Sequence, residues 1–395
     1  MTNEVKKVPE LRFPEFEEIW SNENMGQICN VYDGTHQTPK YTNEGIKFLS
    51  VENIKTLKSN KYISEEAFEK EFKIRPEFGD VLMTRIGDVG TPKVVNVNEK
   101  LAYYVSLALL KPKNINSYFL EALINSSTVQ NEIWRKTLHI AFPKKINKNE
   151  IAKVDINYPE HQEQQKIGDF FSKLDRQIEL EEQKLSLLEE QKKGYMQQIF
   201  SQKLRFKDES GKIYPDWEKR KLNEIADFQN GKAHESYVSE TGNYILVNSK
   251  FISTEAQVKK YVSQQLTPLN QQDIAIVMSD IPNGKALAKC FLVEENNKYS
   301  LNQRIGRLYN ILGDSRFVYA ILNRNKQLLK YDSGVGQTNL KKSEITEIMI
   351  NWPVQDEQQK IGNLFRRFDD FIEGQSQKIE LLKDRKKGFL QKMFV

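Results

Sequence analysis

The feature that most constrains how this chain folds is a stretch of sequence that occurs twice. PEHQEQQKIGDFFSKLD begins at Pro159, and PVQDEQQKIGNLFRRFD begins at Pro353. With an offset of 194 residues, the segments 159–200 and 353–394 are identical at 20 of 42 positions without a gap. The chain is therefore two tandem units, about 1–200 and 201–395, each with a divergent front and a near-constant tail.

The tails are predicted to be long helices that form a coiled coil. Apolar residues recur at alternating spacings of four and three, and polar residues interrupt this seam at the same two places in both copies, Glu181/Gln375 and Lys192/Lys386. Polar seam residues cost stability but fix register and partner number. The prolines suit the first helical position. We expect two rods of about 60 Å each that pair with one another; the alternative is a solvated helix packed on its own domain. The apolar seam residues are Ile167, Phe171, Leu174, Ile178, Leu185, Leu188, Tyr195, Ile199, Ile361, Phe365, Phe368, Ile372, Ile379, Leu382, Phe389 and Met393.

The divergent fronts are predicted to be two globular heads of α+β class, residues 1–158 and 201–352, followed by helices 159–200 and 353–395. Short runs of β-forming residues alternate with Gly, Asn and Asp turns, at 47–54, 80–87, 102–110, 243–252, 273–278 and 286–293. Helices are expected near 117–136 and 315–330. With 21 Phe and 16 Tyr, the chain has enough large side chains to build these cores.

Composition limits the setting in which the protein works. No apolar run is long enough to span a bilayer, and the start has no apolar stretch typical of a signal peptide. Cys29 and Cys290 are too few for a disulfide framework, which fits a reducing cytoplasm. We therefore expect a cytoplasmic protein without a membrane partner. A net charge of +5 does not by itself establish a nucleic-acid partner.

Catalytic signatures are missing from the sequence. There is no Walker A loop, and the four histidines stand alone without metal-ligand spacing. PDWEK at 215–219 resembles a nuclease pattern, but five contiguous residues cannot surround a metal ion. No Asn/Asp-Pro-Pro-aromatic loop is present to hold a target amine. The sequence predicts a non-catalytic chain with no metal site and no cofactor of its own.

At this point the chain closely resembles the specificity (S) subunits of type I restriction-modification systems, the HsdS family, over essentially its whole length. The resemblance rests on the repeated helix starts PEHQEQQKIG and PVQDEQQKIG and on the elements YDGTHQTPKY and GQTNLKKSEI. It implies that each head is a target-recognition domain for one half of a split double-stranded DNA site. The two tail helices would pair antiparallel, set the gap between the half-sites and dock two methyltransferase (M) subunits, with restriction-translocase (R) subunits joining them. S-adenosylmethionine, ATP and Mg would be bound by those partners.

The predicted DNA-binding residues lie in loops rich in hydrogen-bonding side chains, the mixture that reads base edges and phosphates. Each loop taken singly is also typical of an ordinary solvated turn. Arg85 is the best candidate for a bidentate guanine contact, and the lysines for phosphate contacts. In the first head the residues are Thr35, His36, Gln37, Thr38, Lys40, Arg85, Asp88, Thr91, Lys93, Lys144, Lys145 and Lys148. In the second head they are Lys232, His234, Ser236, Tyr237, Asn248, Ser249, Lys250, Asn283, Lys285, Gln337, Asn339, Lys341 and Lys342.

Six residues of the near-constant helix starts are predicted either to cap the helix or to dock the methyltransferases. They are Glu163, Gln164, Gln165, Glu357, Gln358 and Gln359. Two other functions remain open at this point. One is a coiled-coil scaffold that binds proteins and not DNA, and the other is a stand-alone nuclease, which the missing motifs disfavour.

Overall fold

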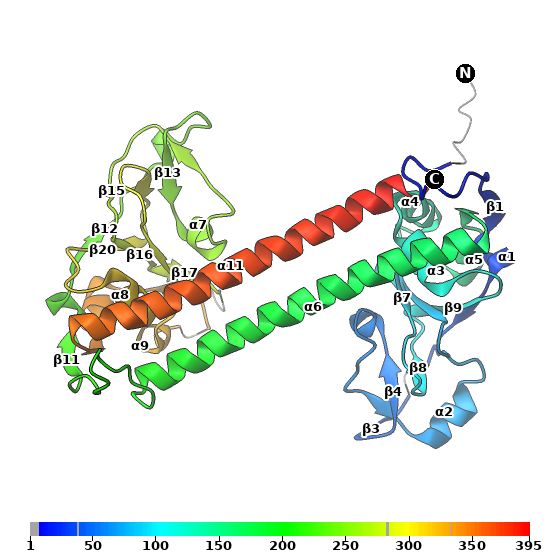
Figure 1. Ribbon diagram of the computed structural model, residues 1–395, viewed down its shortest axis with the longest axis horizontal. Helices are drawn as coiled ribbons and strands as arrows, with labels where there is room; N and C mark the ends of the chain where they lie inside the picture. The colour runs from blue at the N-terminus through cyan, green and yellow to red at the C-terminus, as the bar shows by residue number, and fades with distance from the viewer. Residues whose placement is uncertain (1–7, 38, 282–283, 333) are drawn as a thin grey trace. The chain divides into compact units, whose positions relative to one another are not determined.

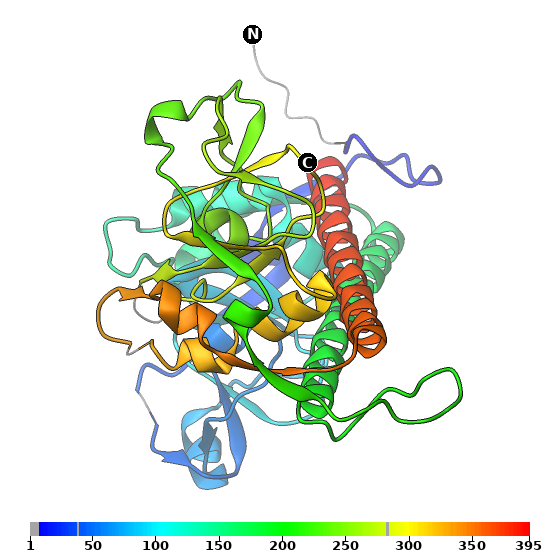
Figure 2. The ribbon, with the colours of Figure 1, turned by 90° about the vertical axis from the view of Figure 1, so that its left-hand side faces the viewer.

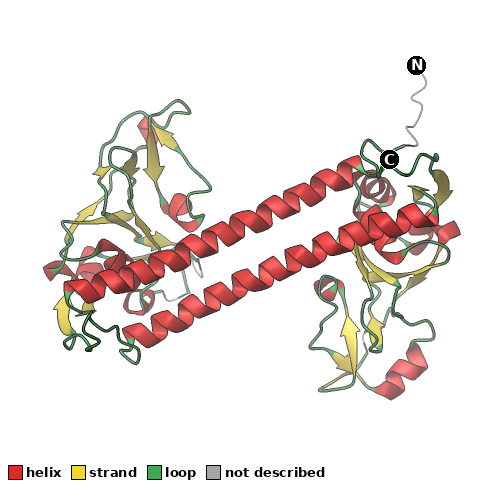
Figure 3. Ribbon diagram, viewed as in Figure 1, coloured by secondary structure: helices red, strands yellow, loops and turns green. Residues whose placement is uncertain are grey.

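The computed structural model describes residues 8–37, 39–281, 284–332 and 334–395, which fold into two units (Figure 1). The first unit comprises the chain up to Gln183 together with Ser376–Val395, and the second comprises Lys184–Gln375. Each unit thus holds one divergent head, the first half of the long helix that follows it, and the last half of the other long helix. Both units mix helices and strands (Figure 3), as predicted for an α+β chain.

The head of the first unit is built from two four-stranded sheets. One is antiparallel with the order β2-β9-β6-β7, and the other has the order β3-β5-β4-β8 with β4 parallel to β8; β1 and β10 form a separate pair. The elements are β1 (Ser21–Asn24), α1 (Met25–Ile28), β2 (Cys29–Asp33), β3 (Tyr41–Thr42), β4 (Ile46–Leu49), β5 (Tyr62–Ile63), α2 (Glu65–Glu71), β6 (Val81–Ile86), β7 (Asp88–Val94), β8 (Leu101–Tyr103), β9 (Leu107–Pro112), α3 (Ser117–Asn125), α4 (Ser127–Lys136), α5 (Lys148–Ala152) and β10 (Asp155–Tyr158).

The head of the second unit repeats this plan. Its sheets have the orders β12-β20-β16-β18 and β14-β13-β19-β15, with β13 parallel to β19, and β11–β22 and β17–β21 are pairs. Its strands and short helices, yellow-green to orange, face the viewer in Figure 2. The elements are β11 (Glu218–Lys221), β12 (Asp227–Asn230), β13 (Tyr244–Val247), α7 (Ser249–Ser253), β14 (Tyr261–Val262), β15 (Pro268–Leu269), β16 (Ile274–Val277), β17 (Ser279–Asp280), β18 (Cys290–Leu292), β19 (Tyr299–Leu301), β20 (Ile305–Tyr309), α8 (Ser315–Leu322), α9 (Lys326–Leu329), β21 (Thr338–Asn339), α10 (Lys342–Thr346) and β22 (Met349–Trp352).

The tails form the two long helices, α6 (His161–Phe200) and α11 (Gln355–Lys392). Every apolar seam residue is buried or half-buried except Tyr195, which is 41% exposed. Leucines off the seam are more open, for example Leu187 at 57%. One face of each helix is therefore covered by protein and the opposite face by solvent. None of the helices in the described part of the chain is long and apolar enough to cross a membrane.

An aromatic cluster recurs at the base of both heads. In the first unit the Trp20 ring lies 6.1 Å from both Phe119 and Phe394, centroid to centroid, so that the end of α11 completes the core of the head. In the second unit the corresponding rings are those of Trp217 and of Phe200 at the end of α6, whose centroids lie 6.3 and 6.2 Å from that of Phe317. Burial of such rings contributes strongly to stability. The packing of these rings therefore holds the end of each long helix against a head.

Several local predictions were wrong at their boundaries. The run 243–252 is a strand only to Val247, because Asn248 caps a short helix there through its side-chain oxygen. The run 102–110 is two strands, and 286–293 is a strand only over Cys290–Leu292. The prolines lie two residues before the first helical residues of α6 and α11, and their carbonyl groups accept hydrogen bonds from helix side chains.

Candidate nucleic-acid interface

Three segments of the first head meet at one end of the antiparallel sheet: the end of β2 at Asp33, the β6–β7 hairpin within 85–93, and the loop 143–150. The backbone N–H of Gly87 donates to Lys144 O at 2.8 Å, and that of Ile146 donates to Arg85 O at 2.9 Å. The carboxylate of Asp33 pairs with Arg85 and lies 3.8 Å from Lys148 Nζ. Segments more than 100 residues apart in sequence therefore present their polar side chains together, as a base-reading surface requires.

The second head brings together two of its predicted loop segments, around 278–280 and 337–340, in an equivalent way. The short strands β17 and β21 pair, Gln337 Nε2 donates to Ser279 Oγ at 2.6 Å, and Leu340 N donates to Met278 O at 2.7 Å. The last contact is the counterpart of the one between Ile146 and Arg85, so Met278 occupies the place of Arg85. The two heads share the backbone frame of this surface and differ in the side chains on it.

The exposure of the predicted DNA-binding residues divides them into groups. Most are accessible to a ligand, and Thr38 and Asn283 lie outside the described residues. Exposed are His36, Gln37, Lys40, Asp88, Lys145, Lys148, Lys232, Ser236, Lys250, Lys285, Gln337, Asn339, Lys341 and Lys342. Half-buried are Thr35, Thr91, Lys93, Lys144, Tyr237, Asn248 and Ser249.

Arg85 and His234 are buried. Arg85 is 5% exposed, its Nε donates to Ile146 O at 3.0 Å, and its guanidinium pairs with Asp33. His234 is fully buried between Lys232 O and Ser300 Oγ, at 2.7 and 2.8 Å. A contact of Arg85 with guanine would require these internal bonds to break, so the geometry favours a role in joining the three segments. The sequence carries no local sign of this, because Asp33 is 52 residues away.

The near-constant helix starts are joined to the beginning of each head by hydrogen bonds between a buried glutamate and an arginine. Glu163 and Glu357 are both fully buried; Glu163 receives two hydrogen bonds from Arg12 at 2.7 and 2.8 Å. Glu357 receives two from Arg205 at 2.8 and 2.9 Å and a third from Trp217 Nε1 at 2.8 Å. The hydrogen bonds with these carboxylates raise the pKa of both arginines. Sequence reasoning missed both arginines, although Leu-Arg-Phe occurs at 11–13 and again at 204–206.

The adjacent glutamines are also used within the chain. Gln164 Oε1 accepts from Asn116 N and its Nε2 donates to Pro159 O, and Gln358 bridges Asp314 N and Pro353 O in the same way. Both glutamines are almost fully buried. Of the six helix-start residues predicted to cap or to dock, only Gln165 and Gln359 are exposed. The burial of the other four favours a role in fixing each head on its helix.

Removing one of these buried carboxylates is expected to destabilise the protein strongly. Glu357→Ala leaves Arg205 and Trp217 Nε1 without their partner, and the free energy of unfolding should fall by about 3–5 kcal/mol. The matched control is Arg220→Ala, which removes a surface pair with Glu218 and should cost less than about 1 kcal/mol. Urea denaturation of both variants measures the difference, and equal losses would contradict the assignment.

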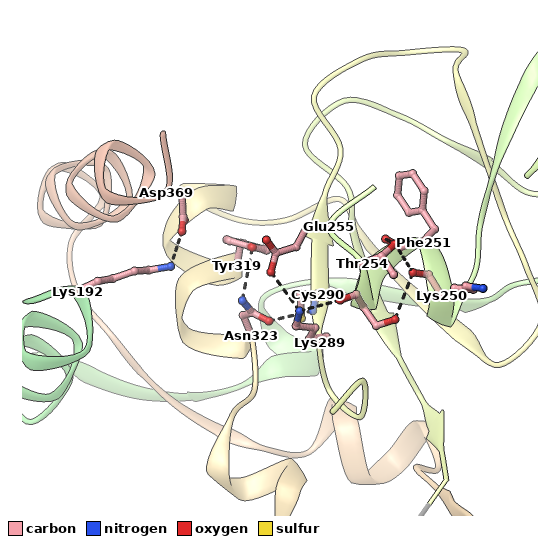
Figure 4. A network of polar contacts seen from close by, with 11 residues as sticks. Lys192, Lys250, Phe251, Thr254, Glu255, Lys289, Cys290, Tyr319, Asn323 and Asp369 are labelled. Carbon is pink, nitrogen blue, oxygen red and sulfur yellow. Dashed lines mark hydrogen bonds and ion pairs between the residues drawn. The ribbon is translucent and has the colours of Figure 1, made fainter. Parts of the chain in front are cut away.

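The long helices carry equivalent ion pairs in the two units. In the second unit Lys192 of α6 pairs with Asp369 of α11, and in the first unit Lys386 of α11 pairs with Asp175 of α6. Figure 4 shows Lys192 pointing at Asp369, with Tyr319 of α8 nearby; Asn323, which follows α8, donates to the Tyr319 hydroxyl. Burial, followed by the charge of Asp369, raises the pKa of Tyr319. The polar seam lysines thus have specific partners, at positions related by the repeat.

No cluster of metal-ligating side chains is found in the part of the chain that the structure describes. The two cysteines are buried, and burial raises the pKa of the Cys29 thiol to about 12. A thiol held protonated in this way is a poor nucleophile and a poor metal ligand.

Comparison with known proteins assigns the family. The model of the type I restriction modification DNA specificity domain matches the chain twice, at residues 17–190 and 214–384. The chain belongs to this family. It is 26% identical over 267 residues to the type I restriction enzyme MjaVIII specificity subunit of Methanocaldococcus jannaschii, an alignment that spans 62% of each protein. It is 23% identical over 347 residues to the MjaX specificity subunit of the same organism, covering 83% of this chain and 80% of the relative.

Two solved structures share the fold. The S subunit of a type I restriction-modification system from M. genitalium superposes with a TM-score of 0.66 at 16% identity, over 98% of this chain and 99% of that one. A chain from a study of complex assembly and conformational transition of the type I R-M system has a TM-score of 0.50 at 13% identity, over 94% and 96%. The repeat found in the sequence is thus a repeat of the specificity domain.

Proposed function

We propose that this chain is the sequence-specific DNA-recognition subunit of a type I restriction-modification complex. The observation that carries the proposal is the double match to the specificity domain, once in each unit. Each head, residues 1–158 and 201–352, would read one half of a bipartite DNA site. Because the two heads share a backbone frame and differ in loop side chains, the two half-sequences would differ and the whole site would be asymmetric.

The helices, residues 159–200 and 353–395, would form an antiparallel coiled coil that sets the gap between the half-sites. The buried seam and the ion pairs Lys192–Asp369 and Lys386–Asp175 support this, since both pairs join α6 to α11 in opposite chain directions. Further pairs in the first unit, Lys378–Glu181 and Lys383–Glu182, follow the same direction. Polar residues at seam positions, such as Lys192 and Lys386, fix register and partner orientation.

The chain itself would carry no catalytic group. Methylation of adenine would be performed by two methyltransferase subunits, with S-adenosylmethionine bound there, and ATP and Mg would be used by restriction-translocase subunits. The helix surface that stays exposed, including Gln165 and Gln359, is the proposed place for methyltransferase docking.

The proposal is tested by DNA affinity of the complex with its methyltransferase. At physiological salt, a duplex that contains the methylated motif should bind about 10³-fold or more tightly than a scrambled duplex of equal length. Equal affinity for the two duplexes in a stable, complete complex would favour the alternative, a coiled-coil scaffold that binds proteins only.

A further inference from the structure

An apolar loop tip in the first head has no role in the account so far. Ile140 and Phe142 are the most exposed large apolar side chains among the described residues, at 99% and 104% of their reference exposure. They lie in the loop between α4 and α5, with Ala141 between them. We call Ile140, Ala141 and Phe142 the apolar tip. A fully exposed Phe contributes nothing to the core, and exposed apolar side chains that lie close together are typical of interaction sites.

The base of this loop is firmly attached to the head. Leu138 N donates to Lys145 O at 2.8 Å, and Lys145 also forms a bridge with Ile86 at the end of β6. The rings of His139 and Trp134 lie 4.1 Å apart, and Lys144 Nζ lies 4.9 Å from the Trp134 ring. These contacts fix the loop on both sides and leave the side chains of Ile140 and Phe142 fully exposed, with Ala141 half-buried between them.

The charge around the tip indicates what it contacts. Lys144, Lys145 and Lys148 follow it within six residues, and the loop is joined through Gly87 and Arg85 to the candidate DNA surface. Proteins that bend DNA insert apolar side chains such as Phe and Ile between base steps, next to cationic residues that hold the phosphates. Exposed apolar side chains followed in sequence by three lysines fit a base step in a duplex better than they fit a hydrophobic protein surface.

We propose that Phe142, supported by Ile140, is a wedge that enters the duplex at one base step in or beside the first half-site. The proposal rests on the proposed DNA-recognition function. The wedge would partly unstack that step and make recognition by this head sensitive to how easily its DNA deforms. Flexible pyrimidine–purine steps would then be favoured at a position that no polar side chain reads.

The second head supplies an internal comparison. With the 194-residue offset of the repeat, Ile140, Ala141 and Phe142 correspond to Gly334, Val335 and Gly336. The loops are equivalent, because Leu340 N bonds to Met278 O as Ile146 N bonds to Arg85 O. No aromatic side chain stands at the corresponding place, so the distortion should occur at the first half-site only.

The test uses the complex of the full chain with its methyltransferase and duplexes that carry 2-aminopurine. The reporter replaces, one at a time, purines in and beside each half-site, excluding the adenines that become methylated. Binding should raise the fluorescence several-fold at one step of the first half-site and at none of the second. Phe142→Gly, which copies Gly336, should abolish this rise and weaken binding about tenfold, whereas Phe142→Leu should retain most of the signal.

The matched control is Phe78→Gly, which removes another exposed Phe of the same head. Phe78 is 62% exposed and precedes the start of β6 at Val81, whereas the loop with the apolar tip contacts the other end of β6, at Ile86. The control should leave fluorescence and affinity unchanged.

A wild-type complex that binds its motif selectively without a rise in fluorescence at any position of the first half-site would overturn the wedge and leave the proposed function standing. A fluorescence rise that persists in Phe142→Gly would also overturn the wedge. Release of the methyltransferase by Phe142→Gly would overturn it too, because the apolar tip would then be a contact with that protein. Loss of all motif selectivity in the wild type would instead refute the proposed function itself.

Discussion

Inserting one heptad into both long helices is expected to lengthen the gap between the half-sites by about three base pairs and to leave both half-sequences unchanged. Seven helical residues add about 10.5 Å, and B-DNA rises about 34 Å in ten base pairs. A whole heptad keeps the apolar seam on the same face. The insertions belong between Gln183 and Lys184 and between Gln375 and Ser376, where one unit ends and the other begins.

These insertion points leave the contacts of each unit in place. Lys386–Asp175 lies within the first unit and Lys192–Asp369 within the second, so neither pair has to change its partner. The control substitutes the flanking exposed residues, Lys184→Ala and Ser376→Ala, without a change in length, and should keep the original gap. Sequencing of the methylated sites reads the gap directly. Altered half-sequences with an unchanged gap would contradict the proposal that the helices set the gap between the half-sites.

Replacing the body of the first head by that of another specificity subunit is expected to rewrite one half of the recognised site. The exchange of residues 25–154 keeps β1, β10 and Trp20, which join the head to the helix ends. It also keeps Arg12 and Glu163. The loops of the first head that are proposed to read bases all lie inside the exchanged segment, so the recognised half-sequence should change with them.

The expected loss is large, because specific sites are bound about 10³-fold or more tightly than unrelated DNA. The original motif should therefore lose its methylation completely, and a new motif should appear that retains the second half. The reciprocal exchange of residues 222–348 is the control and should rewrite the other half alone. A chimera that kept both original half-sequences would place recognition outside the heads.

The repeat made the larger part of the fold predictable. Because 20 of 42 positions are identical between the tails, their helices and seams appear twice in the sequence, and the lysines at 192 and 386 stand out as paired interruptions. The helices near 117–136 and 315–330 were predicted at their places, although each is divided in two by a cap such as Ser126. The tandem organisation was confirmed by the double family match.

What could not be predicted depends on contacts between distant residues. The burial of Arg85 follows from Asp33 on another strand, and that of Glu163 from Arg12, 151 residues away. Glu163 and Glu357 therefore look like exposed helix-start residues in the sequence, whereas in the fold they hold the heads. The strand predicted at 243–252 was extended too far for a local reason, because the cap formed when Asn248 Oδ1 accepts from Phe251 N was not recognised in the sequence.

The measurement that tests the account most directly is long-read sequencing, sensitive to methylation, of DNA from cells that express this chain with its methyltransferase. We expect methyladenine at a single new motif, with two different half-sequences separated by a gap of fixed length. An active methyltransferase in a stable complex with this chain that methylated no defined motif would contradict this expectation, and the protein would then be a scaffold.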